Sequence, residues 1–164
     1  MPKVEKEKIE EKIGECLGLE RAAQQAVEEL NAKGLLDKKK GLKTQLEKMK
    51  KEAGSHQSKL EQVIDRAGGS MGLNKEKIEE SAEEAVQKAT EMMKTYLGEE
   101  PETVDALEFL CLAEAGEVTH YEVLGTLTRS LKDKKLGTAV KSILREEKRH
   151  LQLCMKLAKQ SSLE

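Results

Sequence analysis

Residues 143–150 read Ile-Leu-Arg-Glu-Glu-Lys-Arg-His, and this segment places ionisable side chains inside an apolar stripe. Apolar residues recur at steps of three and four on both sides of it, from Leu136 to Leu157, which is the period of an amphipathic helix. Glu147 and His150 fall on that stripe three residues apart, so the helix presents both on its buried face. A buried carboxylate and imidazole are costly unless neighbouring helices compensate them. The segment therefore predicts a helix whose partners also carry polar groups in the core.

Glycine, proline and asparagine divide the chain into five predicted helices. They cover residues 3–33, 38–67, 75–97, 101–131 and 135–159. Short turns join the first two and the last two, which predicts antiparallel hairpins over 3–67 and 101–160. Residues 68–100 form a crossover with an extra helix. We expect one all-α domain over residues 1–164, an antiparallel four-helix bundle with one long crossover; the alternative is a long antiparallel coiled coil or a loose helical array.

The composition excludes several classes of protein. Charged residues make up 37% of the chain and aromatic residues only 2%, which argues against an all-β fold. No apolar run approaches the ~20 residues of a membrane span, and the N-terminus has no signal-peptide core. A formal charge of −2 gives no reason to expect nucleic acid or a membrane surface as a partner. Three cysteines outside any paired motif are typical of free thiols, so we expect a cytoplasmic location.

Three other predicted helices carry ionisable residues on or beside their apolar stripes. These are Glu20 in 3–33, His56 with Glu52 on its flank in 38–67, and Glu117 with His120 in 101–131. Glu20 and residues 52–56 lie about sixteen to nineteen residues from the turn that joins their helices. Glu117 and residues 147–150 lie about fourteen to seventeen residues from the second turn. All these side chains should therefore meet in one layer across the middle of the bundle.

Several carboxylates in one buried layer would repel one another, so the layer needs a compensating charge. Two divalent cations would balance four carboxylates, and neutral imidazoles would complete the coordination. A Glu-x-x-His segment places both donors on one helix face. The predicted metal ligands are Glu20, Glu52, His56, Glu117, His120, Glu147 and His150. Glu114 and Glu122 are interpreted as outer partners of the ligands or as surface carboxylates.

This pattern resembles the ferritin-like di-iron carboxylate superfamily, in which two helices give one Glu each and two give a Glu-x-x-His pair. The second hairpin, with His-Tyr-Glu-Val at 120–123 and residues 143–148, is similar to the YciF-type stress-associated branch. The resemblance implies two iron or manganese ions and either oxygen or peroxide chemistry or ferrous-iron oxidation. It implies that Glu20 and Glu117 are single ligands, that Glu147 pairs with His150, and that Glu52 pairs with His56. A homodimer is left open.

The chain departs from that family pattern at two places. Glu52 and His56 are four residues apart instead of three, with Gly54 between them. We expect either a π-bulge near Gly54 that turns both side chains inward, or a regular helix in which only one of them is a ligand. In the fourth predicted helix Glu122 competes with Glu117, and the depth argument favours Glu117. The alternative function is a metal-free helical bundle that binds a partner under stress.

Overall fold

The computed structural model describes residues 3–163, and every regular element in this range is a helix. The helices are α1 (Lys3–Ala32), α2 (Leu42–Ser70), α3 (Lys75–Leu97), α4 (Thr103–Thr128) and α5 (Lys135–Ser161). The all-α prediction and its five helices are confirmed. The largest difference is the start of α2, which was expected at Lys38. Gly41 adopts a φ of 89° in the turn before it, a left-handed conformation that a helix cannot continue through.

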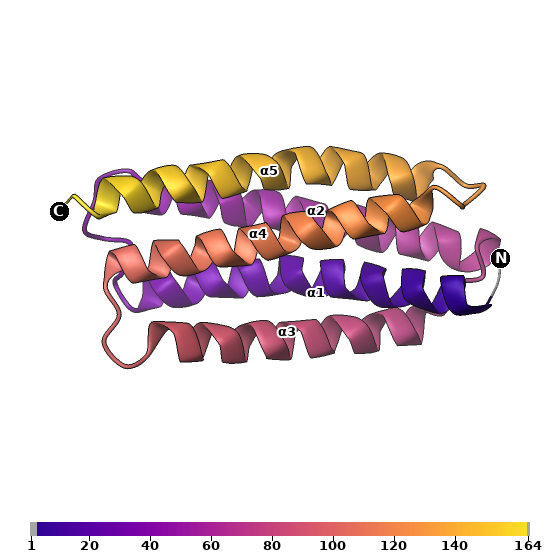
Figure 1. The fold of residues 1–164 in the computed structure, drawn as a ribbon, viewed down its shortest axis with the longest axis horizontal. Coiled ribbons are helices and arrows are strands. Elements are labelled where there is room, and N and C mark those ends of the chain that lie inside the picture. Colours follow the sequence, from indigo (N-terminus) through magenta and orange to yellow (C-terminus); the bar gives the residue numbers. More distant parts are fainter. Residues whose placement is uncertain (1–2, 164) are drawn as a thin grey trace.

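Four of the helices form a bundle, as Figure 1 shows. Helix α1 packs against α2 and α4, and α5 packs against α4 and α2. Helix α3 carries the chain back along the length of the bundle, so α4 starts at the opposite end from the one where α2 finishes (Figure 1). Asn74 caps the start of α3 by accepting hydrogen bonds from the backbone N–H groups of Glu76 and Lys77. Within residues 3–163, no helix has the length and apolar character that crossing a lipid bilayer requires.

Helix α3 lies on the outer side of α1 at unusually short distance. A Cβ atom built at Gly14 would fall 2.4 Å from the carbonyl oxygen of Ile78, and one at Gly18 would fall 2.4 Å from that of Ala82. Only glycine leaves room for this backbone approach. The two glycines therefore fix the place where the extra helix covers the bundle.

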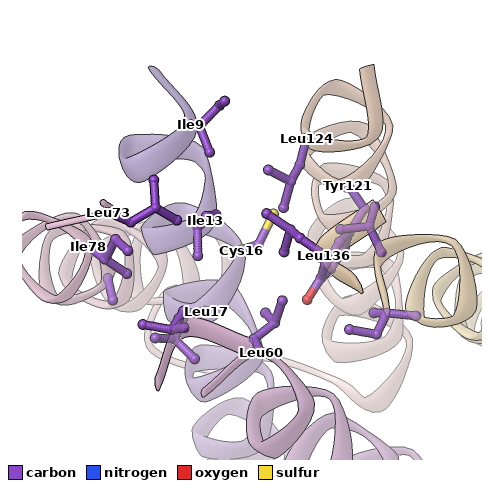
Figure 2. Close-up of a cluster of buried hydrophobic side chains, with 14 of the residues drawn as sticks. Ile9, Ile13, Cys16, Leu17, Leu60, Leu73, Ile78, Tyr121, Leu124 and Leu136 are labelled. Carbon is purple, nitrogen blue, oxygen red and sulfur yellow. The ribbon is translucent and has the colours of Figure 1, made fainter. Parts of the chain in front are cut away.

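The buried apolar side chains form two clusters. One lies toward the α4–α5 turn and includes Ile13, Leu60 and Tyr121, which Figure 2 shows meeting from different helices. The other lies toward the α1–α2 turn and includes Leu36 and Leu107. Each cluster receives side chains from all four bundle helices. Each of these helices carries one or two buried ionisable residues between the two clusters.

Candidate metal centre

Six ionisable side chains are buried in the layer between the two apolar clusters. They are Glu20 of α1, His56 of α2, Glu114 and Glu117 of α4, and Glu147 and His150 of α5, and none is more than 4% exposed. Each bundle helix carries an otherwise regular apolar stripe that one or two of these residues interrupt. The structure thus brings together Glu20, His56, Glu117, Glu147 and His150, which the sequence places in one layer.

The first group of donors surrounds the ring of His56. Its Nδ1 atom lies 3.0 Å from Oε2 of Glu20 and 2.8 Å from Oε1 of Glu147. One donor atom from each of these three residues lies within 4.8 Å of the others, so the group could hold a cation. The other ring nitrogen, Nε2, pairs with the carboxylate of Glu146 at the rim. That contact orients the ring so that Nδ1 faces the interior.

The second group of donors surrounds the ring of His150. Its Nδ1 atom lies 3.5 Å from Oε2 of Glu147 and 3.9 Å from Oε2 of Glu114, and these three residues could also hold a cation. Its Nε2 atom lies 3.6 Å from Oε2 of Glu52 on α2. The two histidines therefore follow the same plan, with Nδ1 inward and Nε2 toward a rim carboxylate on the opposite helix. Their ring centroids are 5.9 Å apart.

Several donor atoms in the layer are buried without a hydrogen-bond partner. They are Oε1 of Glu20, Oε2 of Glu114, Oε2 of Glu117, Oε2 of Glu147 and Nε2 of His150. Each unsatisfied buried polar atom destabilises the folded state by about 1–3 kcal/mol, and by more when the group is charged. The gathering of several such atoms at one place therefore needs an explanation. A cation coordinated by these carboxylates would satisfy their four oxygen atoms, whereas Nε2 of His150 faces Glu52 at the rim. The donor set thus fits bound metal.

The protonation of the layer without a cation follows from burial and mutual repulsion. Burial raises the pKa of Glu20, Glu114 and Glu117 well above their usual range, and neighbouring carboxylates raise it further. Burial acts in the same direction on Glu147, but hydrogen bonds with Glu20, His150 and His56 outweigh it and hold its pKa well below the usual range. Burial opposes charge on His56, yet its contacts with Glu147 and Glu146 raise its pKa. Glu147 therefore carries the negative charge, and protons stabilise the other carboxyls.

Two predicted ligands lie outside the layer, and the prediction that places them inside is corrected. Helix α2 is a regular α-helix through Gly54, so Glu52 points to the rim, where its side chain is 24% exposed and 3.1 Å from a guanidinium nitrogen of Arg149. Only His56 of that pair faces inward. His120 lies off the inner face of α4: Nδ1 is 2.7 Å from the carbonyl oxygen of Gly116, and Nε2 is 2.9 Å from Oε2 of Glu15.

Glu117 and Glu122 take different positions on α4. Glu117 is 3% exposed and lies in the layer. Glu122 is exposed and forms an ion pair of 2.9 Å with Lys148 on α5. Glu117, which the depth argument favours, is therefore the one that faces the layer, and its role as a metal ligand stays a prediction.

Comparison with known proteins does not identify a family for this chain. No model of a protein family, no curated protein and no solved structure matches the chain. Function has to be argued from the layer itself, where buried carboxylates and imidazoles form two overlapping groups that could hold a metal ion.

Sequence reasoning missed three residues near the layer. Glu114 was interpreted as an outer partner, although it lies three residues before Glu117 and so shares the inner face of α4. Glu146 was overlooked because it stands beside the stripe of α5, where only the packing of α2 reveals that it meets His56. Tyr121 is fully buried, and its hydroxyl has no hydrogen-bond partner. Burial raises its pKa well above the usual range, so the phenol is neutral.

A cavity of about 70 Å³ lies between α1, α3 and α4 beside the layer. Much of its wall consists of alanines: Ala22, Ala23, Ala26, Ala89 and Ala113. Glu114 and Glu117 form part of the same wall, so the cavity reaches the buried carboxylates. Since one water needs about 10–15 Å³ on this measure, a molecule of a few atoms can enter.

Proposed function

We propose that this protein binds two divalent metal ions, iron or manganese, in the buried layer and uses them for oxygen or peroxide chemistry or for ferrous-iron oxidation. The observation that carries the proposal is the convergence of buried carboxylate and imidazole side chains from all four helices of the bundle. Five of their polar atoms, on α1, α4 and α5, have no hydrogen-bond partner. Carboxylate oxygen and imidazole nitrogen are ligands that suit both metals. The four buried carboxylates, once ionised, match the charge of two divalent ions.

The arrangement of the bundle supports the resemblance to ferritin-like di-iron carboxylate proteins. In both, donors from four helices meet at mid-bundle, and a Glu-x-x-His pair is present, here Glu147 and His150. The alanine-lined cavity supports the oxygen or peroxide part of the proposal, because it has room for a small uncharged reactant beside Glu114 and Glu117. By the likeness to the YciF-type branch, the chemistry would serve an oxidative-stress response.

Metal stoichiometry tests the proposal. Protein purified without chelators, or loaded anaerobically with ferrous ions and desalted, should hold about two ions per chain by elemental analysis. Replacing Glu147 and His150 together by Ala should abolish this binding while circular dichroism retains most of the helicity, because the layer is a minority of the core. The matched control is His120→Ala, which removes a histidine outside the layer and should keep both ions.

A second reading has two observations in its favour. Helix α2 supplies a single inward donor, and the protonated carboxyls around Glu147 stabilise the layer without a cation. Under this reading the protein is a metal-free helical bundle that binds a partner. Absence of bound metal after anaerobic ferrous loading would exclude the metal proposal and leave this one.

A further inference from the structure

The two hairpins of the bundle repeat one arrangement of donors, and the repeat is broken at one position. His56 on α2 corresponds to His150 on α5, since each points Nδ1 inward and Nε2 toward a rim carboxylate. Glu147 precedes His150 by three residues. The residue three before His56 is Ala53, which is 3% exposed. A methyl group on α2 thus occupies the position where α5 carries a buried carboxylate.

The layer has a fourth buried carboxylate, Glu114, but it comes from α4 and lies in the half of the layer that contains His150. Glu117 on α4 corresponds to Glu20 on α1, and Glu114 lies three residues before Glu117. The residue three before Glu20 is Leu17, which is buried and apolar. Helices α4 and α5 therefore contribute three buried carboxylates and His150, whereas α1 and α2 contribute Glu20 and His56 alone.

Glu147 links the two halves. Its Oε1 atom lies 2.8 Å from Nδ1 of His56, and its Oε2 atom lies 3.5 Å from Nδ1 of His150. It belongs to both donor groups and can be shared by two ions. Without Glu147, each group keeps one carboxylate, Glu20 beside His56 and Glu114 beside His150. The side chain of Glu117 is hydrogen-bonded to that of Glu114, so a further buried carboxylate stands beside the group around His150. The electrostatic attraction for a cation is therefore stronger at the second group.

Resting on the proposed function, we infer that the layer holds two unequal ions. The first occupies the position of Glu114, Glu117, Glu147 and His150 and binds tightly. The second occupies the position of Glu20 and His56, shares Glu147, binds more weakly and exchanges with solution. The asymmetry arises because α2 has Ala53 where a carboxylate would equalise the two positions.

Calorimetric titration of chelator-treated protein with manganese tests this inference. Wild-type protein should bind two ions in two resolved steps, with dissociation constants that differ by at least about tenfold, as expected when one position lacks a ligand. Glu114→Gln should weaken the first step by about tenfold or more, and Glu20→Gln should weaken only the second. Both substitutions keep the size of the side chain, so the fold is retained. Glu122→Gln, on the exposed face of α4, is the matched control and should change neither step.

Ala53→Glu adds the missing carboxylate and should strengthen the second step by about tenfold, which brings the two constants together. If that variant does not fold, the two isosteric variants decide alone. Two equal steps in wild-type protein, or equal weakening of both steps by Glu114→Gln and Glu20→Gln, would overturn the asymmetry and leave metal binding intact. No binding to wild-type protein would instead overturn the proposed function itself.

Discussion

His56 and His150 each divide their ring nitrogens between the interior of the layer and its rim. A metal-binding histidine is usually held by an acceptor on its outer nitrogen, which fixes the tautomer and the orientation of the ring. Glu146 supplies such an acceptor to His56, from the opposite helix. Glu52 also faces a histidine of the opposite helix, but it lies 3.6 Å from Nε2 of His150, which has no hydrogen-bond partner. The rim pairs also connect α2 with α5 at the level of the site.

Removing the outer carboxylate from His56 should weaken the metal position without unfolding the protein. Glu146→Ala is expected to lower affinity at the position of Glu20 and His56 by about 10- to 100-fold, because the ring loses its orientation. Glu146→Gln keeps an acceptor oxygen and should lose less. Manganese titration measures the effect, with Lys148→Ala on the exposed face of α5 as the control. Unchanged affinity in Glu146→Ala would show that packing alone orients the ring.

The sequence identified those site residues that are ionisable but stand on the apolar face of a predicted helix. Glu20, Glu147 and His150 interrupt apolar stripes, and the structure buries each of them. His120 was expected in the layer on the same reasoning, but the inner face of α4 passes through Glu117 and Tyr121 and leaves it beside Glu15. The sequence pattern locates the inner face of a helix only to within about one residue. It therefore cannot decide which of two neighbouring residues on that helix is buried.

Helix α3 approaches α1 closely at Gly14. A Cβ atom built there would also lie 2.5 Å from Cβ of Ser81, so a side chain at this position would push the two helices apart. Gly116 on α4 offers a contrast, since a Cβ atom there would have no neighbour within 4 Å. The two glycines have the same helical conformation and different surroundings.

Alanine substitutions at these two positions should therefore have opposite effects. Gly14→Ala is expected to lower the free energy of unfolding by about 1–3 kcal/mol, because the methyl group must displace backbone atoms of α3. Gly116→Ala should raise it by roughly 0.5–1 kcal/mol, because alanine is the better helix former. Urea denaturation of the metal-free variants measures both. A stabilising Gly14→Ala would mean that α3 can shift away from α1.

Element boundaries followed closely from the sequence because turn residues mark them. Asn74 and Gly98 limit α3 as expected from their capping preferences. The expected start of α2 failed because Lys38 to Lys40 read as helix formers, and only the left-handed φ of Gly41 delays the helix. Of the two alternatives expected at Gly54, a π-bulge or a regular helix with one inward side chain, α2 shows the regular helix, with His56 buried and Glu52 at the rim.

The whole molecule keeps a layer of acids in its interior, so its stability depends on protons or cations. The pKa values of Glu20, Glu114 and Glu117 are raised, so the folded state favours their neutral form, and ionising them lowers the stability of the fold. The raised pKa of His56 acts in the same direction. Among the buried carboxyls of the layer, Glu147 has a lowered pKa and acts in the opposite direction, but its contribution changes with pH only below its ordinary value of 4.5.

Metal-free protein should therefore lose stability as pH rises. The contribution of the three raised carboxyls is complete below their ordinary value of 4.5 and is lost as pH rises through their folded pKa values. Denaturant unfolding should show lower stability at pH 8 than at pH 5.5, by on the order of 1 kcal/mol or more. Metal-loaded protein should show the reverse, because ligands must be deprotonated, and affinity should fall below about pH 6.

A matched variant separates this effect from general charge repulsion. Glu20→Gln, Glu114→Gln and Glu117→Gln combined should flatten the pH dependence of the metal-free protein, because the amides cannot ionise. A flat profile in the wild-type protein would contradict the raised pKa values.

The separation of the apolar interior into two clusters affects how the bundle opens. Each end has its own hydrophobic contacts from all four bundle helices, so each can behave as a separate cooperative unit in native-state hydrogen exchange. The acidic layer is then the boundary at which the two units communicate. Cations that bind only when the layer is closed would merge them into one unit, so that metal loading slows amide exchange at both ends of the molecule, far from the ligands.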